Sequence, residues 1–161
     1  MPGSAESTLP TCTRKFLTED APETRDLAQR LAERLQAGDF VALIGELGAG
    51  KTTFAQGLAA GLGVTGRVSS PTFVLMHCHP GPLPLCHVDA YRVATGQELR
   101  EAGVEEYADA AVTAVEWADR VPDFWPPEVI VVNLAYTDTT RRVELTGRGS
   151  RLAAVVRELS A

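Results

Sequence analysis

Cysteine, lysine and asparagine are scarce in this chain of 161 residues, and no long apolar run occurs in it. The three cysteines (Cys12, Cys78 and Cys86) include no Cys-x-x-Cys pair, and their odd number argues against a disulfide framework and favours a reducing compartment. No segment approaches the ~20 apolar residues of a membrane-spanning helix. The first residues also lack the basic start and apolar centre of a signal peptide. These absences predict a cytoplasmic protein that makes no membrane contact.

A basic surplus is missing as well, because the formal net charge is -6 and the pI is near 5.1. Tight binding of a nucleic acid usually relies on a basic face that releases counterions. Arginines do gather late in the chain, as Arg141, Arg142, Arg148, Arg151 and Arg157. They form either a local basic patch or an ordinary solvated surface. The chain as a whole is therefore not expected to bind DNA or RNA tightly.

What is present is the composition of a soluble globular protein, with 45% hydrophobic and 22% charged residues. The length fits one compact domain with a substantial core and is too short for two ordinary ones. Residues 1–13 are small and polar, and we expect them to form a disordered tail. Residues 14–161 are expected to form a single domain.

Strand and helix patterns alternate along this domain. Asp20 and Glu23 form a capping-box start for a helix whose apolar stripe predicts an end at Gly38. The unbroken apolar run 40–45 predicts a strand buried on both faces, and a helix is expected from about Thr52 to Leu62. Further strands are expected at 15–18, 73–79, 85–91, 110–115, 129–137 and 141–147, and further helices at 97–107 and 150–159. This order predicts an α/β domain whose mixed sheet includes two antiparallel hairpins.

Residues 45–54, GELGAGKTTF, contain Gly-x-x-x-x-Gly-Lys-Thr between a predicted buried strand and a predicted helix. The glycines let backbone N–H groups turn inward around phosphates, and the helix presents its positive end to the same anion. Lys51 is expected to pair with the β- and γ-phosphates, and Thr52 with Mg²⁺. Of 15 basic residues only Lys15 and Lys51 are lysines, so a lysine here favours a nucleotide site over a structural turn.

A magnesium-bound triphosphate also requires an acidic residue at the end of a neighbouring strand, and Glu116 and Asp89 both fit. Either is alternatively an ordinary surface carboxylate. The guanine-reading Asn-Lys-x-Asp element is absent, because the single asparagine, Asn133, stands in NLAY. The nucleotide is therefore expected to be ATP. Its use remains open between an ATPase that serves another protein, a small-molecule kinase and a non-catalytic regulatory subunit, although no insertion resembles a kinase lid.

Four motifs, GELGAGKTTFAQGLAAGLGV, SSPTF, HVDAYR and VEWADR, resemble in order and spacing those of the TsaE (formerly YjeE) family of bacterial ATPases. The resemblance covers about Thr18 to Gly149 and implies a P-loop NTPase-like three-layer domain. It implies an ATP- and Mg²⁺-dependent component of the complex that forms N6-threonylcarbamoyladenosine at position 37 of tRNAs reading ANN codons. Such a component cycles the complex and does not transfer the group itself. The implied partners are the threonylcarbamoyl transferase subunit and its paralogous binding subunit, of the TsaD and TsaB type. Contact with tRNA is expected to be indirect or weak, the free chain to be a monomer, and its ATPase activity to be weak without partners.

The resemblance also implies roles for particular residues of this chain. The residues implied to bind phosphates are Gly45, Gly48, Ala49, Gly50, Lys51, Thr52 and Thr53. Thr52 and Glu116 would lie on the metal side, and Thr72 would sense the γ-phosphate. Asp89 would serve hydrolysis with Lys51, either by orienting water or by holding the metal through water. Trp117 would pack beside the active site or act as an ordinary core tryptophan. Arg141 would lie near the nucleotide, although Thr140 stands where the family has a glycine.

A second cluster of chemically active side chains consists of Cys78, His79, Cys86 and His87, on the two arms of the first predicted hairpin. Four such ligands are of the kind that hold zinc. Neighbouring residues on a strand point to opposite faces, however, so the four side chains are not expected to converge. We interpret His87 as part of the HVDAYR motif.

Overall fold

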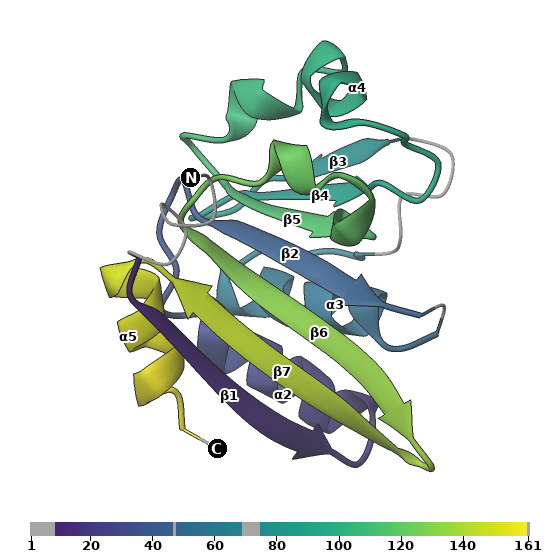
Figure 1. The fold of residues 1–161 in the computed structure, drawn as a ribbon, viewed down its shortest axis with the longest axis vertical. Coiled ribbons are helices and arrows are strands. Elements are labelled where there is room, and N and C mark those ends of the chain that lie inside the picture. The colour runs from purple at the N-terminus through teal and green to yellow at the C-terminus, as the bar shows by residue number, and fades with distance from the viewer. Residues whose placement is uncertain (1–8, 47, 69–74, 161) are drawn as a thin grey trace.

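The computed structural model describes residues 9–46, 48–68 and 75–160 and shows an α/β fold around one mixed, seven-stranded sheet (Figure 1). The strands are β1 (Thr11–Thr18), β2 (Phe40–Gly45), β3 (Met76–His79), β4 (Leu85–Asp89), β5 (Val112–Glu116), β6 (Val129–Thr137) and β7 (Thr140–Arg148). The helices are α2 (Ala21–Ala32), α3 (Lys51–Gly61), α4 (Gly96–Glu101) and α5 (Ser150–Glu158), with the 3-10 turns η1 (Val104–Tyr107), η2 (Ala118–Arg120) and η3 (Pro122–Phe124). None of the helices in the described ranges is long and apolar enough to cross a membrane.

The strand order is β1-β7-β6-β2-β5-β4-β3. At the centre, β2 runs parallel to both β5 and β6, and β4 runs parallel to β5. Antiparallel pairs complete both sides, with β3 on β4 at one edge and β6, β7 and β1 toward the other. The mixed sheet and both antiparallel hairpins, which were predicted from the sequence, are thereby confirmed.

Alternation along β2 explains how the sheet is covered on two faces. Val41 and Leu43 belong to the core cluster that includes most of the buried apolar residues of α2, α3 and α5. Phe40 and Ala42 belong to a second cluster, which includes Leu99 of α4 and residues from η1 and η2. Figure 1 shows the same division, with α2, α3 and α5 along one face and α4 near the β3 edge. A strand buried on both faces is what the unbroken apolar run predicted.

The helix α2 begins as predicted but ends early. The Asp20 carboxylate accepts a hydrogen bond from Glu23 N at 2.9 Å and so caps the first turn. The helix ends at Ala32, six residues before Gly38, so the predicted end was wrong. The chain continues in i→i+3 turns, in which Leu35 N donates to Ala32 O at 3.0 Å. These turns keep Leu35 buried in the core, and the apolar stripe therefore extends beyond the α-helix.

Several other predicted boundaries differ from the structure, and the strand expected at 85–91, for example, ends at Asp89. The first strand begins at Thr11 and not at residue 15, so residues 11–13 belong to the sheet and not to a tail. The helix predicted at 97–107 is divided into α4 and η1, because Gly103 adopts a positive φ of 84° between them. Only glycine adopts this conformation freely, and a continuous helix does not pass through it.

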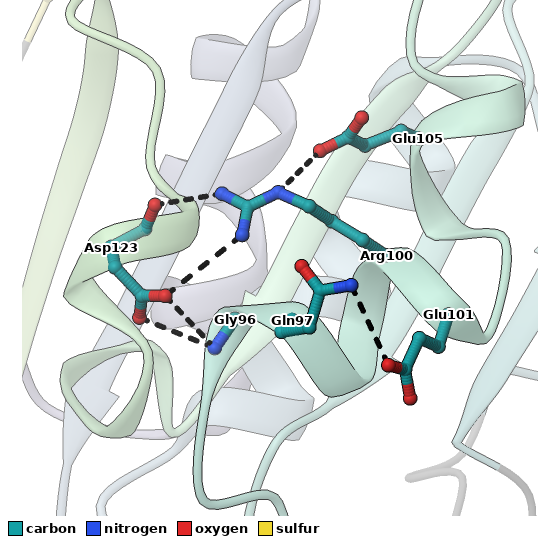
Figure 2. A network of polar contacts seen from close by, with 6 residues as sticks. All are labelled: Gly96, Gln97, Arg100, Glu101, Glu105 and Asp123. Carbon is teal, nitrogen blue, oxygen red and sulfur yellow. Dashed lines mark hydrogen bonds and ion pairs between the residues drawn. The ribbon is translucent and has the colours of Figure 1, made fainter.

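A polar network fixes the segments that follow β4 and β5 (Figure 2). The Asp123 carboxylate accepts hydrogen bonds from Gly96 N at 3.2 Å, at the start of α4. The Arg100 guanidinium lies between Glu105 and Asp123, donating to the Glu105 carboxylate and to the Asp123 carbonyl at 2.9 Å each. These contacts tie α4, which follows β4, to η3, which follows β5.

Candidate functional site

The predicted site residues meet where the parallel strands β2, β4 and β5 end. Asp89 and Glu116, the last residues of β4 and β5, are neighbours in register. On the other side of β5, Glu116 pairs with Leu43 of β2, two residues before the glycine-rich loop begins at Gly45. The carboxyl ends of parallel strands share one edge of a sheet, and the fold thus brings both acidic residues beside the loop.

The loop between β2 and α3 has the shape that its glycines allow. Gly48 and Gly50 have φ angles of 80° and 108°, a region that side chains rarely permit. A Cβ atom on Gly45 would lie 2.6 Å from the carbonyl oxygen of Leu134, so the strand β6 also requires a glycine there. The N-cap of α3 is Gly50, and no side chain caps this helix. The positive end of α3 therefore faces the loop without a side-chain acceptor.

Lys51 begins α3 and is buried, with 5% of its surface exposed. Its ammonium donates to the carbonyl oxygens of Gly45 at 2.6 Å and Glu46 at 2.8 Å, and so closes the loop on itself. It also lies 4.0 Å from the centre of the Trp117 ring. Burial lowers the pKa of Lys51, and the nearby carboxylates, Glu116 foremost, oppose that shift. The Lys51 ammonium is therefore fixed beside the glycine-rich loop by two carbonyl oxygens and the Trp117 ring.

Glu116 is 3% exposed and is held from two sides. The hydroxyl of Thr52 lies 3.2 Å from both of its carboxylate oxygens. On the other side, His87 Nε2 lies 2.6 Å from Glu116 Oε2, and the His87 side chain is fully buried. His87 Nδ1 has no hydrogen-bond partner among the described residues, so the imidazole proton belongs on Nε2, which donates to Glu116. Hydroxyl and carboxylate oxygens are the ligands that Mg²⁺ prefers, so this pair suits a magnesium ion.

Asp89 and Trp117 flank this pair at the ends of the same two strands. Asp89 Oδ1 accepts a hydrogen bond from Tyr91 N at 2.9 Å. Trp117 has a positive φ of 58°, which is uncommon for a residue with a side chain and is concentrated at functional sites. Its ring lies over the Lys51 ammonium and 4.9 Å from the Tyr91 ring, with the Arg120 guanidinium 5.6 Å away. Trp117 is thus placed beside the site and only partly buried.

Arg141 approaches the loop from the β6–β7 hairpin. Its Nε would lie 3.3 Å from a Cβ atom on Gly50, and the Tyr136 ring would lie 3.8 Å from one on Gly48. Arg141 Nη2 donates to the Tyr136 hydroxyl at 2.8 Å. Its Nε is buried and has no partner within the part of the chain that the structure describes. A buried donor without a partner beside a glycine-rich loop suits an anionic ligand.

The structure therefore gathers most of the residues that the sequence singled out. Ala49 is buried in the loop, Thr53 lies half-buried in the first turn of α3, and the other predicted residues surround them. Thr72 lies outside the described residues. His87, Tyr91 and Tyr136 contact the site without having been assigned to it. Period-two alternation was a usable signal for His87, since residues 87 and 89 of one strand share a face.

The Cys78, His79, Cys86 and His87 cluster does not converge. Cys78 and Cys86 are opposite each other on one face of the β3–β4 hairpin, and His87 faces Glu116 on the other. Within residues 9–46, 48–68 and 75–160, no group of three or more His, Cys, Asp or Glu residues is arranged to hold a metal ion. The four side chains are therefore divided between the two faces of the hairpin, with Cys78 and Cys86 on one face and His79 and His87 on the other.

Comparison with known proteins identifies the family. The sequence profile of the threonylcarbamoyl adenosine biosynthesis protein TsaE matches residues 18–143. The chain belongs to the TsaE family. The TsaE protein of Streptomyces coelicolor is 45% identical over 139 residues, which cover 80% of this chain and 93% of that protein. The Bacillus subtilis TsaE protein is 38% identical over 149 residues, covering 91% and 93% of the two chains.

A solved member of the family has the same fold. The crystal structure of Bacillus subtilis YdiB superposes with a TM-score of 0.79 at 33% sequence identity, covering 93% of this chain and 95% of that one. Both curated relatives are named as tRNA threonylcarbamoyladenosine biosynthesis proteins. The match to the TsaE profile spans the glycine-rich loop and both acidic strand ends.

Proposed function

We propose that this chain binds and hydrolyses ATP with Mg²⁺, as the ATPase component of tRNA threonylcarbamoyladenosine biosynthesis. One arrangement carries the proposal: the Thr52–Glu116 pair lies beside a glycine loop and a helix start that no side chain caps. An anion fits the helix start, and a hard cation fits the oxygen pair next to it. A triphosphate with its magnesium ion supplies both charges in one ligand.

In this proposal the loop holds the phosphates through backbone N–H groups of Gly48, Gly50 and the first turn of α3. The Lys51 ammonium exchanges its bonds to two loop carbonyls for bonds to the β- and γ-phosphates. Magnesium, when bound, neutralises the charge that develops on the phosphates, and Thr52 and Glu116 would hold it. Arg141 would direct its unpaired Nε at the nucleotide from the β6–β7 hairpin.

Asp89 lies next to Glu116 in register and is the residue that we propose orients the attacking water. Trp117 shields the Lys51 ammonium from solvent and so strengthens its field at the phosphates. Thr72 is proposed to sense the γ-phosphate. The helices on both faces of the sheet support a three-layer P-loop NTPase-like arrangement.

We propose that a partner complex uses the free energy of ATP hydrolysis. We place the chain beside a threonylcarbamoyl transferase subunit and its paralogous binding subunit, of the TsaD and TsaB type, where it cycles the complex that modifies position 37 of tRNAs reading ANN codons. Contact with tRNA is indirect or weak, in line with the net charge of -6. The free chain is proposed to be a cytoplasmic monomer.

Release of ADP from ATP, measured with purified chain and no acceptor, tests the chemistry. We expect slow turnover that requires Mg²⁺ and a preference for ATP over GTP when both compete with a fluorescent ATP analogue. ADP that forms only when a metabolite acceptor is added would show a kinase. Tight ATP binding without turnover, even with both partners present, would show a regulatory subunit.

A further inference from the structure

The β3–β4 hairpin brings two thiols together on the face away from the nucleotide site. Cys78 and Cys86 are direct partners in the antiparallel register, and their Sγ atoms lie 2.9 Å apart. Cys78 is exposed, whereas Cys86 is completely buried. The nucleotide site makes no use of either side chain, because His87 and Asp89 point to the other face of β4.

The register shows that this pair has the backbone spacing of a disulfide. Asp89 N donates to Leu75 O at 3.0 Å, which makes the residues at 75 and 89 a hydrogen-bonded pair. Hydrogen-bonded and non-hydrogen-bonded pairs alternate along an antiparallel ladder, so Cys78 and Cys86 form a non-hydrogen-bonded pair. Such pairs have Cα atoms about 4.5 Å apart, within the range of about 4.4–6.8 Å that disulfides span. Closing the bond therefore requires side-chain rotation but no movement of the strands.

From this geometry we propose that Cys78 and Cys86 are an oxidation site, which a peroxide converts to an intrachain disulfide. The Cys78 thiol attacks the peroxide, the O–O bond breaks, and a Cys78 sulfenic acid and one water form. The Cys86 sulfur then attacks the Cys78 sulfur, and the hydroxyl leaves as a second water. The two thiols lose two protons and two electrons in total, and the peroxide takes up both and is reduced to two waters.

The two cysteines have different roles in this sequence because their surroundings differ. Cys78 is accessible to a peroxide, and the buried Cys86 is not. Burial raises the pKa of Cys86, and contact with Cys78 raises it further, so Cys86 is a poor nucleophile toward oxidants in solution. Its position beside Cys78 overcomes this disadvantage only for the intramolecular step.

Cys12 provides an internal control. It lies on β1, at the opposite edge of the sheet from β3, and is the remaining cysteine of the chain. Trypsin also separates the pair from the control, because Cys78 and Cys86 share one peptide between Arg67 and Arg92, and Cys12 lies before Arg14. Loss of two hydrogens from the 68–92 peptide is distinct from addition of oxygen at Met76, which lies in the same peptide.

The experiment treats the reduced full chain with hydrogen peroxide and then counts free thiols after unfolding. We expect the count to fall from three to one. The 68–92 peptide should resist alkylation, and dithiothreitol should restore all three thiols. The Cys12→Ser variant should lose both remaining thiols in the same way. In Cys78→Ser, an exposed change that leaves the core intact, Cys86 should oxidise at least about tenfold more slowly.

Three results would overturn the proposal. One is retention of an alkylatable Cys86 while Cys78 oxidises alone. Another is oxidation of Cys86 at an unchanged rate in Cys78→Ser. The third is disulfide formation only between chains, at a rate that rises with protein concentration. None of these readouts involves nucleotide, so the outcome is independent of the proposed ATPase function.

Discussion

At the scale of single residues, Lys51 is the cation that we expect to pair with the phosphates of ATP beside the glycine-rich loop. Its ammonium is bonded to two loop carbonyl oxygens and lies 4.0 Å from the centre of the Trp117 ring, and in our proposal it exchanges the carbonyl bonds for bonds to the phosphates. We expect Lys51→Ala to weaken ATP binding by about 100-fold or more, since charge-assisted hydrogen bonds to phosphate are lost. Titration with a fluorescent ATP analogue measures this. Lys15→Ala, at the other, exposed lysine, is the matched control and should bind normally.

The two carboxylates are expected to give different defects. Glu116 contacts the Thr52 hydroxyl through both carboxylate oxygens, so Glu116→Gln should weaken the response of nucleotide affinity to Mg²⁺. Asp89→Asn should bind MgATP and hydrolyse it more slowly, by about 100-fold, if it orients water. Magnesium titrations of binding and of turnover distinguish the two variants. Exchanged phenotypes would reverse the two assignments.

His87 is expected to act as a positioning residue for Glu116. Its Nε2–H holds one carboxylate oxygen at 2.6 Å and leaves the group oriented toward Thr52. We expect His87→Ala to reduce the Mg²⁺-dependent gain in nucleotide affinity about tenfold and to leave metal-free affinity unchanged. His87→Gln, whose amide N–H reaches a similar position, should restore much of the gain. Equal loss in both variants, with and without Mg²⁺, would indicate a purely structural role.

At the scale of elements, α2 and α3 pack closely through small residues. A Cβ atom on Gly57 or Gly61 would lie 2.6 Å from the Cβ atom of Ala28 or Ala32, respectively. Gly57→Ala should therefore separate the helices and lower the free energy of unfolding by about 1–3 kcal/mol, despite the higher helix propensity of alanine. Urea denaturation measures the change. Ala60→Ser, an exposed change on α3, is the control, and an equal loss there would contradict the packing argument.

The elements also show what the sequence predicts well and what it does not. The run 40–45 and the loop after it were recognisable because burial on both faces and the Gly-Lys-Thr pattern are local properties. The early end of α2 was not, because turns beyond Ala32 keep Leu35 in the core and preserve the helical spacing. The approach of Tyr136 to the loop was also unpredictable from local patterns, since it depends on β6 pairing with β2 across the sheet. Arg141 was expected there only through the family resemblance.

At the scale of the whole molecule, the described residues around the proposed nucleotide site are mostly buried or pack against the glycine-rich loop. Lys51, Glu116 and His87 are buried, and Arg141 and Trp117 cover the loop. A chain of this size that hydrolyses ATP would therefore transmit the energy to a partner, through segments whose order depends on the γ-phosphate. The pattern SSPT ends at Thr72, the proposed γ-phosphate sensor, four residues before β3 begins at Met76.

We therefore expect weak ATPase activity from the isolated chain and a rise of about tenfold or more when the TsaD- and TsaB-type subunits are added, because a partner commonly completes such a site. Thr72→Ala should leave ATP bound and remove most of this stimulation. Thr65→Ala, an exposed threonine between α3 and the SSPT segment, should retain it. ADP release with purified partners, with and without tRNA, measures each variant. Fast turnover by the isolated chain, unchanged by any partner, would contradict the coupling and favour a kinase that acts alone.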